Sequence, residues 1–264
     1  MPLIKINNFD IFYEIHGQGY PLVMILGLGA NINWWGKYFL KELAKEFTII
    51  IYDNRGTGKS QDPDEDFTIK ILAEDVKFLI EKLELKQVNV FGHSMGGSIA
   101  QELALNYNLV KKLVLCSSSC GGKMSIAASR EVLNMVERSR KGRMVEEIAK
   151  DNLFLFFSEE FLAKNPKLME YAIINMSESP ISSKNYIRQQ NAITHFNTCN
   201  RLKQLEIETL IIHGKKDILV PPENSKILNE LIPNSKLRFF EKSAHAPFTE
   251  EPNEVLKTLI EFLK

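Results

Sequence analysis

The 264-residue chain lacks several features that mark particular classes of protein. Its 33 Lys and Arg residues balance its 33 Asp and Glu residues, so no net charge recruits nucleic acid or an anionic membrane surface. No run approaches the ~18 consecutive apolar residues that a membrane-spanning helix needs. Residues 1–6 also lack the basic and then apolar layout of a secretion signal. We therefore expect a cytoplasmic protein whose partner is a neutral small molecule, and neither nucleic acid nor a membrane.

Cysteine is also scarce. The three cysteines, Cys116, Cys120 and Cys199, have neither the spacing of a zinc site nor that of a redox motif. We expect all three to be reduced thiols, and we expect no metal site.

What the chain does contain is an alternation of strand and helix patterns. Two runs alternate like a hairpin, and later runs are continuously apolar, which is typical of strands buried on both faces. The eight runs cover residues 3–9, 10–15, 21–26, 47–52, 88–91, 112–115, 209–212 and 236–240. Helical periodicity lies between them, most clearly at residues 72–83 and 255–263. The pattern predicts an α/β fold: a mostly parallel eight-stranded sheet with helices on both faces.

One segment interrupts this alternation. Residues 121–200 show helical patterns but no convincing strand, so we divide the chain into a core, residues 1–120 and 201–264, and a helical insertion. An insertion after a central strand lies over the carboxyl ends of the strands, where ligands bind. We interpret it as an apolar lid, with Phe154 and Phe157 as candidate substrate contacts. Its charged run at residues 137–143 is interpreted as a solvated face.

A serine lies between the strand pattern at residues 87–91 and the helical pattern at residues 98–104. The intervening sequence is Gly92-His93-Ser94-Met95-Gly96-Gly97. At such a turn a serine takes a strained backbone conformation and its hydroxyl projects, while the glycines remove side chains that would clash. We predict that Ser94 is a nucleophile, and that the adjacent histidine packs beside it or supports it.

A serine hydroxyl needs a histidine to take its proton and a third group to orient that histidine. His245 lies in a loop directly after the last strand, at the carboxyl edge of the sheet and beside the turn at residues 92–97, which we call the elbow. Asp217 follows the strand at residues 209–212 and reaches the same edge. No acidic residue occupies residues 116–120, the alternative position for the acid. We therefore predict Ser94, Asp217 and His245 as the catalytic residues.

Acyl transfer also needs two donors for the oxyanion of the tetrahedral intermediate. The backbone N–H of Met95 supplies one, and the glycine-rich loop at residues 27–31 supplies the other, which we assign to Leu28. Trp34 and Trp35 follow this loop and are candidates for the wall of an acyl pocket.

Taken together, these motifs resemble the α/β-hydrolase superfamily, in the branch with a serine nucleophile and a helical cap after the sixth strand. The resemblance covers nearly the whole chain and implies the α/β-hydrolase fold. The order of nucleophile, acid and histidine along the chain matches that superfamily. The matching motifs are residues 92–97, 52–60, 217–221 and 243–245, with Pro252 beyond. One departure is Leu26-Gly27, which stands where the family commonly has His-Gly before the oxyanion loop.

Two glycine-containing motifs resemble nucleotide-binding sequences but do not match them. Residues 56–60, Gly-Thr-Gly-Lys-Ser, resemble the end of a phosphate-binding loop, but Asp53 stands where the first glycine of that motif is required. Residues 27–32 miss the final glycine of a dinucleotide fingerprint. We therefore expect no nucleotide and no other cofactor.

The resemblance implies a hydrolase. A serine nucleophile argues against haloalkane dehalogenases and epoxide hydrolases, which attack through a carboxylate. We expect a carboxylesterase that hydrolyses small to medium apolar esters through an acyl-enzyme. Enol-lactone hydrolysis, carbon–carbon bond hydrolysis of a ring-cleavage product and cofactor-free perhydrolysis, as in haloperoxidase-like relatives, remain alternatives. So does a slow-turnover ligand sensor that signals through its cap.

Overall fold

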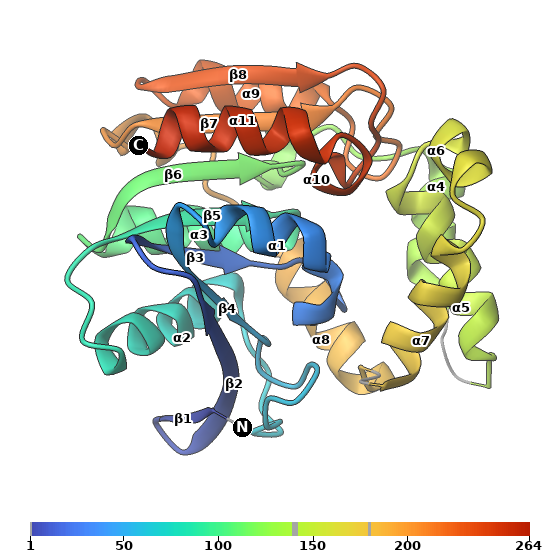
Figure 1. Cartoon of the computed structure of the whole chain (residues 1–264), viewed down its shortest axis with the longest axis horizontal. Helices are drawn as coiled ribbons and strands as arrows, with labels where there is room; N and C mark the ends of the chain where they lie inside the picture. The colour runs from blue at the N-terminus through green and yellow to red at the C-terminus, as the bar shows by residue number, and fades with distance from the viewer. Residues whose placement is uncertain (1, 139–141, 179–180) are drawn as a thin grey trace.

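The computed structural model describes residues 2–138, 142–178 and 181–264 (Figure 1). Eight strands within these ranges form one sheet in the order β1-β2-β4-β3-β5-β6-β7-β8. Strand β2 pairs antiparallel with β1 and β4, and the other neighbours are parallel. The strands are β1 (Leu3–Ile6), β2 (Phe9–His16), β3 (Tyr20–Ile25), β4 (Phe47–Tyr52), β5 (Val88–His93), β6 (Val110–Cys116), β7 (Thr209–Gly214) and β8 (Ser235–Phe240). The predicted mostly parallel eight-stranded sheet is confirmed.

The central strands are apolar on both faces because each face carries its own core. In β3, Val23 and Ile25 pack into one buried cluster, whereas Leu22 and Met24 pack into the other. Successive side chains of a strand point to opposite faces, so an uninterrupted apolar run fills both cores at once. This is why the sequence shows runs of isoleucine, leucine and valine rather than strict alternation.

Helices cover both faces of the sheet. Buried residues of α2 (Ile69–Lys82), α3 (Met95–Asn106) and α9 (Glu223–Leu231) belong to one core, and those of α1 (Lys37–Leu43) and α11 (Pro252–Leu263) belong to the other. The short elements η1 (Ile32–Trp35) and α10 (Pro247–Glu250) lie in the loops after β3 and β8. No helix in the described part of the chain is long and apolar enough to cross a membrane.

The segment between β6 and β7 is helical. It contains η2 (Gly122–Met124), α4 (Arg130–Glu137), α5 (Val145–Phe156), α6 (Glu159–Lys164), α7 (Leu168–Glu178) and α8 (Ser183–Thr194), and η3 (Leu202–Gln204) follows before β7. Figure 1 shows α4 to α7 at the end of the sheet toward which the strand arrows point. We call residues 121–200 the helical segment. Residues 139–141 of the charged run predicted to be a solvated face lie outside the described residues.

A disulfide joins the two ends of the helical segment. Cys120 and Cys199 are bonded, with their Cα atoms 5.1 Å apart, whereas Cys116 is free and buried. The expectation of three reduced thiols was therefore wrong for two of them. The ends are brought together by an isolated antiparallel bridge between Gly121 and Asn197. This pairing depends on the folded path of the segment, so a sequence separation of 79 residues gave no sign of it.

Candidate active site

Ser94 lies at the sharp turn between β5 and α3. Its φ and ψ are 58° and −123°, a conformation that L-residues rarely adopt and that costs about 1–3 kcal/mol. The neighbouring glycines make the turn possible, because a Cβ at Gly96 would collide with the carbonyl oxygen of Ile25. A Cβ at Gly27, on the oxyanion loop, would lie 2.8 Å from the Cβ of Ser94. The elbow is therefore pressed directly against the loop that follows β3.

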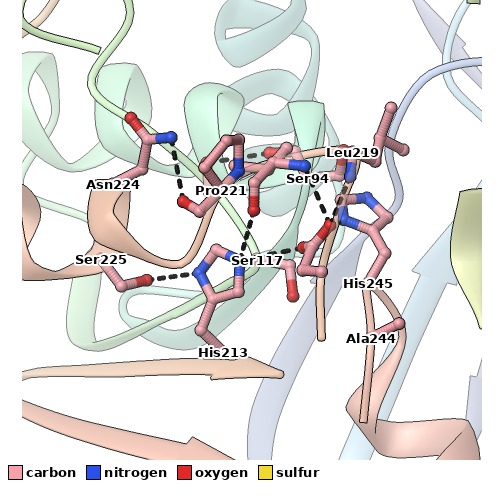
Figure 2. Close-up of polar contacts among 12 residues, drawn as sticks. Ser94, Ser117, His213, Leu219, Pro221, Asn224, Ser225, Ala244 and His245 are labelled. Carbon is pink, nitrogen blue, oxygen red and sulfur yellow. Dashed lines mark hydrogen bonds and ion pairs between the residues drawn. The ribbon is translucent and has the colours of Figure 1, made fainter. Parts of the chain in front are cut away.

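His245 and Asp217 meet at the same edge of the sheet. Asp217 lies in the loop after β7 and His245 in the loop after β8, and both are buried. His245 Nδ1 donates a hydrogen bond of 2.7 Å to Asp217 Oδ2 (Figure 2). Because Nδ1 carries the proton, Nε2 of the neutral ring is a proton acceptor. This Nε2 is buried and has no hydrogen-bond partner among the described residues.

Asp217 is held as a carboxylate by its surroundings. Its Oδ1 accepts the backbone N–H groups of Leu219 and Val220, each at 2.9 Å. Burial alone would raise the pKa of Asp217, but the charge of His245 and hydrogen bonds from His213 and His245 hold that pKa well below its ordinary range. The group is therefore ionised wherever the protein is folded near neutral pH.

The two residues predicted to supply the oxyanion donors, Leu28 and Met95, line the same cavity as Ser94. Met95 is the first residue of α3, whose amino-terminal N–H groups point away from the helix. Neither the Met95 N–H nor the Leu28 N–H donates a hydrogen bond within the described parts of the chain. The loop itself is fixed, since Gly29 N–H donates to Gln189 Oε1 of α8 at 2.8 Å and Ile32 N–H donates to Asp53 Oδ1 at 2.8 Å. Both predicted backbone donors are thus available in the cavity that Ser94 lines.

Ser94 and His245 line one cavity of about 210 Å³. Its lining comes both from the core and from the helical segment. The lining residues are Leu26, Gly27, Leu28, Ala30, Trp34, His93, Ser94, Met95, Ser98, Ser118, Ser119, Val136, Asn152, Leu155, Phe156, Phe157, Tyr186, Ile193, Leu219, Val220, His245, Ala246, Phe248 and Thr249. None of these is Asp, Glu, Lys or Arg. Within residues 2–138, 142–178 and 181–264, no group of three or more His, Cys, Asp or Glu side chains is placed to hold a metal ion.

The structure places the four predicted substrate contacts in different environments. Trp34 and Phe157 line the cavity, but Trp35 and Phe154 do not. Trp35 is fully buried against Phe91 and Phe248 in the core, because η1 turns it inward. Phe154 is 43% exposed, on the outer side of α5. The expectation for Trp35 and Phe154 is corrected accordingly.

Sequence reasoning missed Phe156 as a wall of the cavity. This ring stacks on His245, with centroids 5.6 Å apart and planes 22° from parallel. The backbone carbonyl of Phe156 also accepts the N–H of Ala246, next to the histidine. A cluster of phenylalanines at residues 154–157 did not indicate which ring faces inward, because that depends on how α5 docks on the core.

His93 contacts His245, the predicted catalytic histidine. Its Nε2 donates to the carbonyl of His245 at 2.9 Å, and the two rings lie 4.7 Å apart. Burial, followed by the charge of His245, lowers the pKa of His93 from 6.5 to about 3. The ring is therefore neutral and bridges the elbow to the loop that carries His245.

A parallel sheet with a serine elbow and an Asp–His pair at its carboxyl edge defines the class of α/β-hydrolases. The chain belongs to this family: the model of the alpha/beta hydrolase fold matches residues 20–252. The protein is an enzyme of this family, as its hydrolase-named relatives also indicate.

Similarity to individual proteins extends over nearly the whole chain. A protein named carbamate hydrolase RutD from Pseudomonas savastanoi pv. phaseolicola is 27% identical over 260 residues, which cover 96% of this chain and 98% of that protein. The esterase EaEST from Exiguobacterium antarcticum is 28% identical, with a TM-score of 0.83, and the match covers 97% of this chain and 96% of that chain. The enol-lactonase from Burkholderia xenovorans LB400 has a TM-score of 0.88 over 99% of both chains, and at 22% identity it shows the shared fold.

Proposed function

We propose that the protein is a serine carboxylesterase that hydrolyses small to medium apolar esters through an acyl-enzyme. One observation carries this proposal. Ser94 and the unpaired Nε2 of His245 belong to one cavity, whose described lining contains no Asp, Glu, Lys or Arg side chain. We further propose that the helical segment, residues 121–200, acts as a cap, since it supplies much of the apolar wall around these groups.

The first half of the reaction forms the acyl-enzyme. Ser94 Oγ attacks the ester carbonyl carbon while His245 Nε2 takes the hydroxyl proton. The carbonyl oxygen becomes an oxyanion, and the N–H groups of Leu28 and Met95 bind it, each contributing about 3 kcal/mol. The intermediate then collapses, the bond to the alcohol oxygen breaks, and His245 gives its proton to the departing alcohol.

Water completes the cycle. His245 Nε2 takes a proton from water, whose oxygen attacks the acyl carbon and forms a second oxyanion. When this intermediate collapses, the bond to Ser94 Oγ breaks and His245 returns the proton to the serine. The carboxylic acid leaves. Throughout, Asp217 stabilises the imidazolium and fixes its orientation.

The cavity favours a neutral substrate of modest size. Burying a carboxylate without a cationic partner costs several kcal/mol, and no Lys or Arg lines the described cavity. Trp34, Phe156 and Phe157 present apolar faces that suit a short alkyl or aryl group. The esterase likeness supports this choice. An uncharged carbamate ester, suggested by the relatives named as carbamate hydrolases, presents the same carbonyl and fits the same chemistry.

The test compares initial rates on p-nitrophenyl acetate, butyrate, hexanoate and octanoate. Ser94→Ala should abolish turnover and the acyl-enzyme adduct seen by mass spectrometry, while circular dichroism stays that of the wild type. The matched control is Ser98→Ala, which changes another serine that lines the cavity and lies in the first turn of α3. Unchanged turnover in Ser94→Ala would exclude this mechanism.

A second comparison separates neutral from anionic substrates. p-Nitrophenyl butyrate and the p-nitrophenyl monoester of succinic acid have acyl chains of equal length, but only the second carries a carboxylate. We expect kcat/KM to be at least about 100-fold lower for the anionic ester. A preference for it would instead favour acidic lactones or ring-cleavage products. Absence of any turnover would move the search to the sensing role.

A further inference from the structure

A second histidine contacts the acid of the active site. His213 is the penultimate residue of β7 and is completely buried. Its Nε2 lies 2.9 Å from Asp217 Oδ2 and 2.9 Å from the carbonyl oxygen of Val220. Its Nδ1 lies 2.6 Å from Ser225 Oγ at the beginning of α9 (Figure 2). Both ring nitrogens are therefore engaged.

The hydrogen-bond partners of His213 determine which nitrogen of its neutral ring carries the proton. Asp217 Oδ2 and the Val220 carbonyl are both acceptors, so the proton must be on His213 Nε2. Nδ1 is then an acceptor, and the hydroxyl of Ser225 donates to it. Ser225 is itself completely buried, so this hydroxyl has no water to turn toward. Ser225 thereby selects the tautomer that donates to the carboxylate.

Asp217 Oδ2 is shared by two histidines. It accepts His213 Nε2–H at 2.9 Å and His245 Nδ1–H at 2.7 Å. The other oxygen, Oδ1, accepts the two backbone N–H groups of Leu219 and Val220. Four donors thus hold the carboxylate, and only one of them belongs to the residue that takes part in proton transfer. Rotation of the carboxylate would break several of these bonds together.

We propose that His213, with its tautomer set by Ser225, is a positioning residue that holds Asp217 Oδ2 in place to orient His245. The assignment rests on the proposed function, because it describes how the same proton-transfer pair is oriented. A buried histidine that served packing alone would not need its Nε2–H on the oxygen that binds His245. The short path from Ser225 through His213 to Asp217 links α9 to the reacting groups.

The central test replaces His213 by leucine, which removes the donor, and by glutamine, whose side-chain amide can donate from nearly the same place. We expect His213→Leu to lower kcat about 10- to 100-fold with little change in KM, the size of one hydrogen bond to a charged group. His213→Gln should recover most of the lost kcat. Thr209→Val, a buried polar-to-apolar change on the same strand, should leave kcat unchanged.

Two further measurements do not depend on the ester assignment. A fluorophosphonate probe phosphonylates Ser94 with loss of fluoride, and its rate needs the same histidine whatever the natural substrate. The proton between His245 Nδ1 and Asp217 also gives a far-downfield NMR signal. If the wild type hydrolyses no ester, the proposed function fails, yet slower labelling and loss of that signal in His213→Leu would still support the positioning role.

Ser225→Ala provides the test if His213→Leu does not fold. It keeps the His213 ring and removes only the hydroxyl that selects its tautomer. We expect a several-fold fall in the labelling rate and faster exchange of the downfield proton. The proposal would be overturned if Ser225→Ala and any folded His213→Leu kept the kcat, the labelling rate and the NMR signal of the wild type. A loss in His213→Leu that His213→Gln fails to restore would also overturn it.

Discussion

Replacing His93 by glutamine is expected to make the protein less sensitive to acid. The wild-type ring is buried, and its Nε2–H donates to the carbonyl of His245 at 2.9 Å. A glutamine amide can make the same hydrogen bond but does not titrate in this range. The substitution therefore removes one buried ionisable group while preserving the contact that the group makes.

The magnitude follows from the lowered pKa of His93, about 3 instead of 6.5. As pH falls below 6.5 the unfolded chain binds a proton at this residue and the folded protein does not, so the wild type loses stability. The loss approaches about 1.4 kcal/mol per pH unit. Between about pH 7.5 and about pH 4.5 it amounts to about 2.5 kcal/mol from this residue alone. The stabilisation is complete above pH 6.5 and disappears as pH approaches 3.

The assay is urea unfolding followed by tryptophan fluorescence at several pH values across this range. The free energy of unfolding should fall more steeply with acid in the wild type than in His93→Gln, by the 2.5 kcal/mol estimated above. His195→Gln makes the same change on the exposed end of α8 and should keep the wild-type slope. Equal slopes in the wild type and His93→Gln would refute the reasoning, whatever the offset between the two curves.

Three other predictions concern the site and its frame. Asp217→Asn should lower kcat on p-nitrophenyl esters by about 10⁴, because the amide favours the wrong histidine tautomer; near-wild-type rates would point to a different acid. Phe156→Ala should shift the preferred acyl chain to greater length, whereas Phe154→Ala, on the exposed side of α5, should not. An unaltered chain-length profile in Phe156→Ala would show that the acyl group lies elsewhere. Cys120→Ser should reduce the free energy of unfolding by about 4 kcal/mol, since the disulfide closes a loop with a sequence separation of 79. Urea curves that coincide for this variant and the oxidised wild type would contradict that estimate.

The parts that were predictable from sequence rest on local patterns. The apolar runs of the central strands β3 to β7 indicate burial on both faces, and the alternation of strands with helices indicates the parallel sheet. The glycines around Ser94 indicate a sharp turn in which a larger side chain at their positions would collide with the neighbouring backbone. Asp217 and His245 could be paired because parallel strands bring their carboxyl ends to one edge, and the structure joins them through a 2.7 Å hydrogen bond.

The parts that were not predictable depend on docking between distant elements. Trp35 has the same side chain as Trp34, which lines the cavity, and Phe154 has the same side chain as Phe156. Only the orientations of η1 and α5 determine which of these rings faces the cavity. The disulfide required the path of the whole helical segment. His213 was visible as a strand-end residue four positions before Asp217, but its contact with the acid depends on how the loop after β7 turns back.

The bond between Cys120 and Cys199 closes the helical segment into a covalent ring. The chain enters this ring from β6 and leaves it toward β7 at the same disulfide. A protease that cuts within the ring leaves both pieces of the chain attached, so β6 and β7 stay in one molecule until a reductant is added. The ring also fixes the distance between its two ends independently of what lies inside it. We therefore expect β6 and β7 to keep their register when the length of chain between these cysteines is changed.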